Sequence, residues 1–301
     1  GVTGELLWRY RHEHESDDLT GIVTSRNLAI YDDKIFLTTF DAHIVALDAR
    51  TGDVVWNEAG ADYRHGFRYT AGAIIVRGQV VVSTNGCERY HEAKEVPCFI
   101  SAHDAQTGEV RWRTSTVARP GEPGGDTWGD TPLMYRIGGD SWTAGSYDPV
   151  TNLIYWATAQ AKPWARFQRG HSGDALYTNS VLALNPNGGS LVWYNQLLPG
   201  ETHDMDETFE NLLVDHSGRQ SLFKMGKLGI LWELDRLTGR FVAAHDLGYQ
   251  TILDVHPQTG EVSYRPGMIP EEGVELEFCP SVAGFKSWRA MAYHPATEAF
   301  Y

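Results

Sequence analysis

The chain has 301 residues, of which 42% are apolar and 31 are glycine, so it is long enough to bury a large core. Its net charge of −14 argues against a nucleic acid or an anionic membrane as its partner. No run of 18 apolar residues is present, so no segment is expected to span a membrane. An acidic surface suits a basic protein partner such as a small electron carrier, and it serves ordinary solubility equally well.

A nine-residue pattern recurs along the chain. In two of the three clear copies an apolar strand runs into an Asp-x-x-Thr-Gly turn and a second strand ends on Trp; the copy at 185–193 has Asn-Pro-Asn-Gly-Gly in the turn and also ends on Trp. The clear copies are residues 48–56, 104–112 and 185–193; Gly4–Trp8 resembles the end of an earlier copy, and weaker copies lie at 235–239 and 256–264.

Each copy predicts a β-hairpin, because Asp can accept hydrogen bonds from the turn backbone and Gly supplies positive φ. Repetition at about 40 to 80 residues predicts the blades of a β-propeller. The Trp of one blade would then fill the gap to its neighbour. Unrelated hairpins in a β-sandwich are the alternative.

The rest of the chain is also predicted to be β. Strands are expected at residues 34–40, 44–47, 74–83, 99–103, 153–158, 181–184, 221–225 and 229–234. Long irregular insertions, which usually carry function on a rigid scaffold, are expected at 10–25, 57–70, 113–136, 161–178 and 265–286. We expect residues 1–301 to form a single propeller domain of about five blades. A closed propeller needs more, so we expect the chain to be part of a longer one, with a processed or truncated start at Gly1.

The chain has three cysteines, Cys87, Cys98 and Cys279. Cys87 and Cys98 flank a short polar loop and could close it as a disulfide, which would indicate an oxidising compartment. Cys279 then has no partner in the chain. No Cys-x-x-Cys-His motif is present, so no c-type haem is expected to attach here.

Polar residues stand at the ends of several predicted strands. Glu88, Gln160, Asp204 and Asp206 offer only oxygen ligands, which suit a hard cation such as calcium, or a trivalent ion if carboxylates are many. Asp204 and Asp206 project to the same side if their segment is extended. Taken singly, each is more often a solvated loop charge. The twelve histidines show no helical His-x-x-x-His spacing, and His203 is expected to have only a loop role.

Several further motifs occur in collinear order over most of the chain. They are Ser25–Asn27, Asn85–Glu88, Gly138–Trp142, Ser146–Pro149, Pro163–Trp164, Tyr177–Thr178, Asp204–Asp206 and Gly226–Arg236. This set resembles the PQQ-dependent alcohol dehydrogenases, the methanol-dehydrogenase-like quinoproteins. The resemblance implies an all-β, eight-bladed propeller, with pyrroloquinoline quinone (PQQ) and Ca²⁺ or a lanthanide ion as cofactors.

The resemblance implies four metal ligands. Glu88 stands at the family's metal-binding glutamate, and Asp204 stands at the catalytic aspartate, which also contacts the metal. Gln160 replaces the usual asparagine ligand and is longer by one methylene. Asp206 stands at the extra carboxylate of the lanthanide-dependent members, where an added negative charge suits a trivalent ion.

The resemblance also implies the cofactor contacts. Trp142 matches the Trp that stacks under the quinone ring, and Lys227 matches the cation beside the ortho-quinone oxygens. The other implied contacts are Arg26, Thr70, Asn85, Gly86, Cys87 and Trp288. The family's vicinal disulfide over the quinone is replaced by Thr20-Gly21, so the second face of the cofactor is covered differently or is bound less tightly. Trp142 as a blade-docking Trp and Lys227 as a solvated turn residue are the alternatives.

The implied activity is that of a periplasmic oxidoreductase that converts a small alcohol to an aldehyde. Asp204 would act as general base, the metal as Lewis acid, and Lys227 as the stabiliser of the developing oxyanion. A c-type cytochrome or a similar acceptor would take the electrons, and a homodimer is one compatible assembly. The alternative is a non-catalytic propeller, a scaffold or binding module that has lost PQQ.

Overall fold

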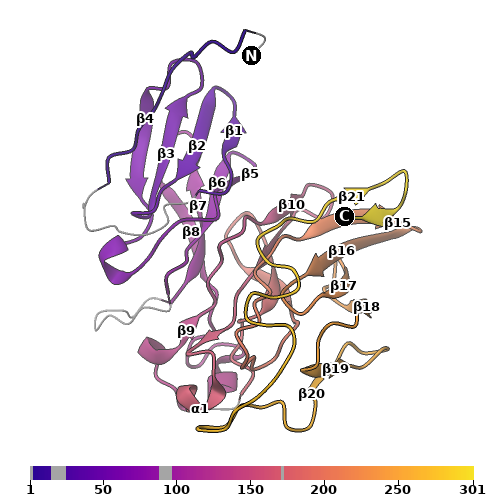
Figure 1. Ribbon diagram of the computed structural model, residues 1–301. Coiled ribbons are helices and arrows are strands. Elements are labelled where there is room, and N and C mark those ends of the chain that lie inside the picture. The colour runs from indigo at the N-terminus through magenta and orange to yellow at the C-terminus, as the bar shows by residue number, and fades with distance from the viewer. Residues whose placement is uncertain (1–2, 15–24, 88–96, 171–172) are drawn as a thin grey trace.

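The computed structural model describes residues 3–14, 25–87, 97–170 and 173–301. Four four-stranded antiparallel sheets follow one another along the described chain (Figure 1). The first sheet contains β1 (Ala29–Tyr31), β2 (Lys34–Thr38), β3 (His43–Asp48) and β4 (Val54–Ala59). The second contains β5 (Ile74–Val76), β6 (Gln79–Ser83), β7 (Phe99–Asp104) and β8 (Val110–Ser115).

The third sheet contains β10 (Ser146–Asp148), β11 (Leu153–Ala157), β13 (Ser180–Leu184) and β14 (Leu191–Gln196). The fourth contains β15 (Leu212–His216), β16 (Arg219–Met225), β17 (Ile230–Asp235) and β18 (Phe241–Asp246). Three two-stranded pairs complete the strands: β9 (Ile137–Gly138) with β12 (Ala161–Lys162), β19 (Leu253–Val255) with β20 (Val262–Tyr264), and β21 (Tyr293–His294) with β22 (Ala299–Phe300).

The described helices are short. α1 covers Arg166–Arg169, and 3-10 turns cover Tyr63–His65, Gly125–Trp128 and Leu133–Tyr135. Within the described ranges no helix has both the length and the apolar character to cross a bilayer.

The prediction of an all-β propeller is confirmed, and seven of the eight expected strands lie within two residues of their predicted ends. The expectation of a single strand at 74–83 is wrong. The segment forms the hairpin of β5 and β6, because Arg77 (φ 52°) and Gly78 (φ 76°) reverse the chain between the two strands. Four sheets are complete, and residues 253–301 add only two-stranded pairs.

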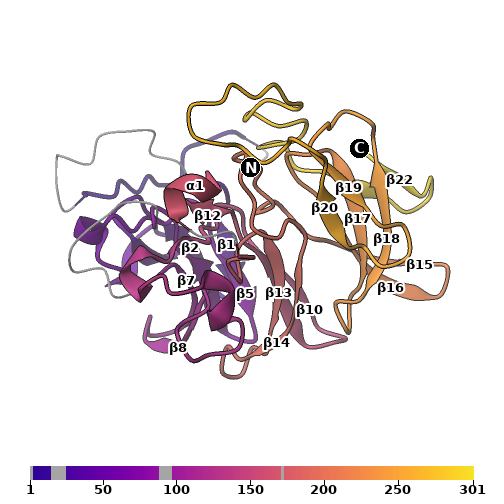
Figure 2. The same ribbon diagram turned by 90° about the horizontal axis from the view of Figure 1, so that it is seen from below.

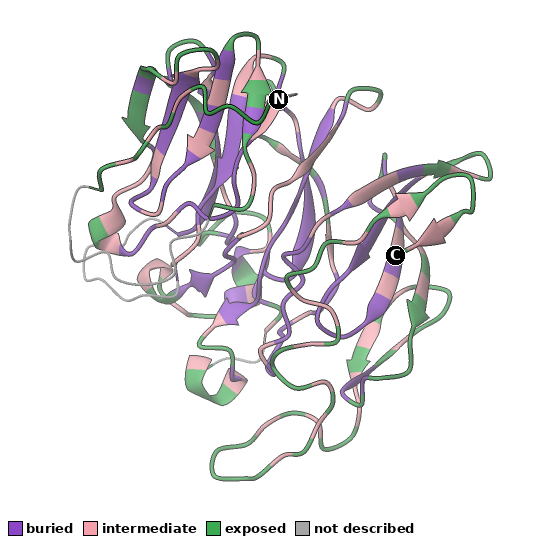
Figure 3. Ribbon diagram, turned by 45° about the horizontal axis from the view of Figure 1, so that its top comes forward, coloured by how far each residue is buried: buried purple, intermediate pink, exposed green. Residues whose placement is uncertain are grey.

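The sheets stand side by side in an arc, with their first strands innermost. β5 contacts both β1 and β10, and β10 contacts β15. Seen from below, the sheets fan outward from these strands (Figure 2). The hydrophobic clusters lie between neighbouring sheets; one of them joins Val81 and Ile100 of the second sheet to Ile154 and Leu182 of the third. Burial is greatest in the middle strands, and the outermost strands and the turns are exposed (Figure 3).

A Trp at the end of each repeat docks onto the turn of the following repeat. The Trp56 indole donates from Nε1 to the Ala105 carbonyl at 3.2 Å, and its ring covers Gly108 so closely that a Cβ there would lie 2.9 Å from it. Gly108 also has φ of 79°, which disfavours any residue with a side chain. The same contact is made by Trp8 on Gly52, Trp112 on Gly189, and Trp193 on Gly239.

The Asp of each turn holds the backbone that the indole covers. The Asp104 carboxylate accepts from the backbone N–H groups of Gln106 and Thr107 at 2.8 and 2.9 Å. A hydrogen bond from Arg111, together with these two, lowers the pKa of Asp104 to about 2. The Asp104 carboxylate therefore stays ionised, and its hydrogen bonds to the turn backbone persist, at any pH well above 2.

Removal of one docking indole should destabilise the fold strongly. We expect Trp56→Ala to lower the free energy of unfolding by about 3–5 kcal/mol, because a buried aromatic ring leaves a cavity between two sheets. Urea unfolding followed by tryptophan fluorescence measures the change. Val55→Ala is the matched control, since Val55 lies on the same strand and is exposed, and it should change stability by no more than about 0.5 kcal/mol.

Candidate active site

Two aromatic rings and an arginine meet where the cofactor contacts were predicted. The ring centroids of Trp142 and Trp288 are 5.7 Å apart, and the Arg26 guanidinium lies 4.4 Å from the centroid of Trp288. Arg26 also donates to the carbonyl of Thr70 at 3.0 Å. Residues from four distant parts of the chain therefore form one continuous group.

The predicted segment Asn85–Cys87 borders this group. Asn85 pairs with Arg68 through both backbone groups, at 2.9 and 3.0 Å, and the Cys87 N–H donates to the Asp140 carboxylate at 3.0 Å. Cys87 and Cys98 form the expected disulfide. Asp140 is two residues before Trp142, so the disulfide loop is tied to the segment that carries the predicted stacking ring.

A second group contains two carboxylates and two lysines. Lys227 Nζ lies 2.6 Å from Asp206 Oδ2 and 3.8 Å from Asp204 Oδ1, and it also donates to the Asp204 carbonyl at 2.7 Å. Lys162 Nζ is 3.8 Å from the same Asp204 oxygen. Gln160 is fully buried and donates from Nε2 to Asp204 Oδ1. These residues come from the ends of β12 and β16 and from the loop before β15.

The two carboxylates differ in access to solvent. The side chain of Asp204 is 26% exposed and that of Asp206 is 4% exposed. Burial raises the pKa of Asp206, although the Lys227 charge acts in the opposite direction. Asp206 is therefore the structural partner of the lysine, and Asp204 is the carboxylate that a small molecule can reach.

Hydrogen bonds between neighbouring residues join the two groups. Ser141, next to Trp142, accepts a hydrogen bond from the Thr208 hydroxyl at 3.3 Å, and Thr208 follows Asp206 by two residues. Phe285 N–H donates to the Lys227 carbonyl at 2.7 Å, and the chain continues from there to Trp288. The surface groove of about 880 Å³ between β8 and β14 lies elsewhere and contains none of these residues.

Four of the predicted site residues have a buried polar atom with no hydrogen-bond partner among the described residues. The atoms are Thr70 Oγ1, Asn85 Oδ1, Trp142 Nε1 and Gln160 Oε1. Buried polar atoms are normally paired, so each marks a place where a ligand atom can bind. A half-turn of the Gln160 amide would also bring its oxygen, in place of its nitrogen, toward Asp204.

The two structural alternatives for Trp142 and Lys227 do not hold. The indoles that cover turn glycines are those of other residues, and Trp142 faces Trp288 instead. Lys227 is buried and paired with Asp206. Among the described residues, the His203 ring packs on Tyr264, with the two ring centroids 5.8 Å apart, and it is not paired with Asp204 or Asp206. Burial lowers the pKa of His203 to about 4. Glu88 and Thr20-Gly21 lie outside the described residues.

The sequence reasoning missed a set of buried ionisable residues beside the site. Burial raises the pKa of Glu207 to about 7 and that of Glu201 to about 8, and it lowers the pKa of Lys224 to about 7. Lys162 lies in the expected insertion at 161–178, where no role was predicted for it. The signal was the density of charged residues in 201–210 and 224–227, whose burial no linear pattern reveals.

Residues 1–244 match the family model described as PQQ, glucose/ethanol/alcohol dehydrogenase, beta-propeller domain. The fold and the site thus define a quinoprotein-type propeller, and the chain belongs to this family. It is similar to quinohemoprotein alcohol dehydrogenase ADH IIB of Pseudomonas putida, with 32% identity over 100% of this chain and 45% of the relative. It is similar also to quinoprotein alcohol dehydrogenase PedH of Pseudomonas putida, with 32% identity over 99% of this chain and 54% of the relative.

Among solved structures the chain resembles a europium-containing methanol dehydrogenase, with a TM-score of 0.89 and 26% identity over 98% of this chain and 55% of that one. The chain therefore spans about half the length of the proteins it matches.

Replacement of Lys227 should destabilise the fold, because its buried partner Asp206 then has no ion-pair partner at this position. In metal-free protein we expect Lys227→Met to lower the free energy of unfolding by about 3–5 kcal/mol, since Asp206 is left as an unpaired buried charge. Urea unfolding measures the loss. The double variant Asp206→Asn/Lys227→Met should recover much of it, and a double variant as unstable as the single one would contradict the pairing.

Glu201 should make stability depend on pH. Its folded pKa of about 8 lies above the ordinary 4.5, so the folded state holds an extra proton between these values and the free energy of unfolding falls as pH rises through this window. Glu201→Gln should flatten that decline between about pH 5 and 8, measured by urea unfolding. Glu271→Gln, at an exposed position, is the control and should leave the slope unchanged.

Proposed function

We propose that residues 1–301 form one propeller domain that carries the active site of a PQQ-dependent alcohol dehydrogenase. The observation that carries the proposal is the buried Lys227, which contacts Asp206 and Asp204 beside the Trp142 and Trp288 rings. A scaffold has no need for an accessible carboxylate held against a buried lysine, because burying such charges costs stability.

The proposed cofactor is pyrroloquinoline quinone, bound against Trp142. The Arg26 guanidinium suits its carboxylates, and Thr70, Asn85 and Trp142 offer the buried polar atoms that lack partners. Gly86 and Cys87 lie in the segment that borders the ring, and Trp288 faces Trp142. Bound quinone would supply the two-electron acceptor for alcohol oxidation.

The proposed metal ligands are Asp204, Asp206 and Gln160, with Glu88 as the fourth. Their oxygen-only chemistry suits a hard cation, either Ca²⁺ or a lanthanide ion. The similarity in fold to a europium-containing methanol dehydrogenase supports a lanthanide as one candidate for this site. With Glu88, three proposed carboxylate ligands would stand against the two lysines, and this excess of negative charge suits a trivalent ion.

Asp204 is the proposed general base. It is the more exposed of the two aspartates, and the Lys227 and Lys162 ammonium groups both lie 3.8 Å from its Oδ1, so its carboxylate is held in place beside the position of a substrate hydroxyl. Lys227 has the second proposed role, to stabilise negative charge that develops on an oxygen bound near it. The substrate is a small alcohol, whose hydroxyl would approach Asp204.

The proposed location is the periplasm, and the proposed electron acceptor is a c-type cytochrome or a similar carrier. The Cys87–Cys98 disulfide supports an oxidising compartment. The net charge of −14 suits a basic carrier, and by name the similar proteins include quinohemoproteins. A homodimer remains a prediction.

Substitution of the proposed base should remove turnover without removing the cofactor. In the full-length protein we expect Asp204→Asn to reduce alcohol oxidation by at least about 100-fold, because general-base catalysis contributes about that much. The near-ultraviolet absorbance of bound quinone should remain. Activity close to that of the unmodified protein would refute the assignment of the base.

The same preparation tests the enzyme against the non-catalytic alternative. Elemental mass spectrometry and an absorbance spectrum of the full-length protein should give one Ca²⁺ or lanthanide ion and one PQQ per chain. If neither binds after PQQ is added with each metal, the propeller is a binding module and the proposed function fails.

A further inference from the structure

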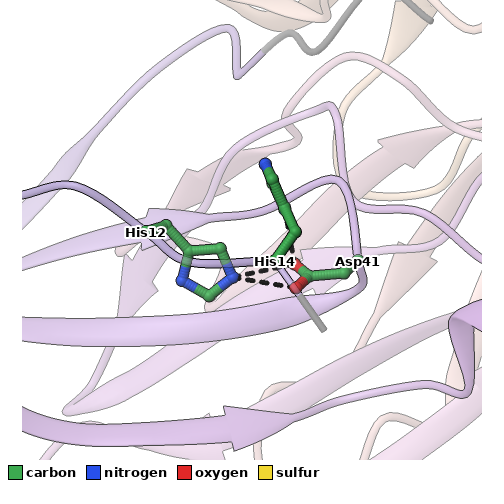
Figure 4. A group of neighbouring side chains, drawn as sticks. All are labelled: His12, His14 and Asp41. Atoms are coloured by element: carbon green, nitrogen blue, oxygen red, sulfur yellow. Dashed lines mark hydrogen bonds and ion pairs between the residues drawn. The ribbon is translucent and has the colours of Figure 1, made fainter. Parts of the chain in front are cut away.

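Two histidines and an aspartate meet on the first sheet, away from the proposed active site (Figure 4). His12 Nε2 lies 3.0 and 2.9 Å from the two oxygens of Asp41, and His14 Nδ1 lies 3.4 Å from Oδ1. The three ligand atoms, one from each residue, all lie within 4.8 Å of one another. The N-terminal segment 3–14 supplies both imidazoles, and the loop between β2 and β3 supplies the carboxylate.

The local sequence explains why the two rings face one carboxylate. In an extended segment, side chains two positions apart point to the same side, so Tyr10, His12 and His14 share one face. Arg11 and Glu13 between them are exposed. This alternation places both histidines against the first sheet.

The carboxylate is fixed before any ion arrives. The Asp41 side chain is completely buried, and the Thr39 hydroxyl donates to its Oδ1 at 2.5 Å. The other ring nitrogen of His12 is hydrogen-bonded to the Tyr10 hydroxyl at 3.2 Å. Metal-ligating histidines usually have such a partner on their second nitrogen, which orients the ring.

The spacing fits tetrahedral coordination. With metal–ligand bonds of about 2.0 Å, neighbouring ligand atoms around a tetrahedral zinc ion lie about 3.3 Å apart. Asp41 Oδ1 lies 3.0 Å from His12 Nε2 and 3.4 Å from His14 Nδ1, and these two separations bracket this value. The His14 side chain is 30% exposed, so solvent can reach the cluster and water can fill a fourth position.

The donor set differs in kind from that of the proposed active site. Two imidazole nitrogens and one carboxylate suit a borderline metal such as Zn²⁺, whereas oxygen-only ligands suit Ca²⁺ or a lanthanide.

We propose that His12, His14 and Asp41 form a second metal site, which binds a divalent transition metal of the zinc type and fixes the N-terminal segment to the loop between β2 and β3. The site is independent of the proposed enzymatic function, since its residues come from the first sheet and the segment before it. The bound ion would replace the His12–Asp41 hydrogen bond with coordination bonds to both residues, so the folded state gains stability with metal concentration.

Co²⁺ reports on this site, because it replaces Zn²⁺ and absorbs visible light when it is tetrahedrally coordinated. Full-length protein without a histidine tag is freed of metal with a chelator and supplied with excess Ca²⁺ to fill the oxygen site. Titration with Co²⁺ should give one visible band per chain that Zn²⁺ abolishes. The melting temperature should rise with Zn²⁺ in parallel.

Three variants separate this site from others. His14→Ala should lose the Co²⁺ band and the Zn²⁺-dependent rise in melting temperature. We expect this variant to fold, because the His14 side chain is partly exposed. Asp204→Asn should keep both, because it alters only the oxygen site. His245→Ala is the matched control for loss of an exposed histidine and should also keep both.

The proposal is wrong if the unmodified protein shows no saturable Co²⁺ band, and the cluster is then a hydrogen-bonded clip alone. It is also wrong if His14→Ala binds Co²⁺ as tightly as the unmodified protein does. Failure of the second site leaves the proposed alcohol oxidation untouched, since PQQ content and turnover are measured separately.

Discussion

The contact between an indole ring and the turn glycine of the next repeat holds the sheets against one another. Each sheet has two apolar faces that it cannot bury alone, and the hydrophobic clusters accordingly lie between neighbouring sheets. The indole closes the outer edge of that interface, because Gly108 and its counterparts leave no side chain under the ring. The innermost strands close the inner edge, where β5 contacts both β1 and β10.

This rigid stack allows the site to be built from irregular segments. Asp204 and Asp206 lie in a loop, Gln160 follows a strand, and Lys227 lies in a tight turn between β16 and β17. Asp204, Asp206 and Lys227 lie outside the regular strand ladders, and Gln160 lies at the end of the short β9–β12 pair. They are held by one another, through the Lys227 ion pairs and the hydrogen bond that joins Ser141 to Thr208. Such a network is stable only because the sheets beneath it keep the loops in place.

Buried charge is concentrated on one side of this stack. Asp206 and Glu207 follow the accessible Asp204 by two and three residues, and Lys224 precedes Lys227 by three residues. All three are buried, and burial shifts the pKa of each in the direction that favours its neutral form. The histidine cluster on the first sheet has a different chemistry, with nitrogen donors on a partly exposed segment. The two proposed metal sites would therefore differ in their ligand atoms, with oxygen alone at one and nitrogen with oxygen at the other.

The repeat determined the fold from sequence alone, because Asp, Gly and Trp at fixed offsets have local roles that survive in any context: Asp104 caps its turn, Gly108 reverses it, and Trp56 fills the space above it. The ordered motifs likewise brought Asp204, Asp206, Gln160 and Lys227 into one predicted site. Tertiary structure decided the rest. Only the packed chain shows that Asp206 is buried while Asp204 is accessible to solvent. Only there do His12 and His14 meet Asp41. Burial and contacts between distant segments depend on how the sheets stack, and they leave no periodic signal in the sequence.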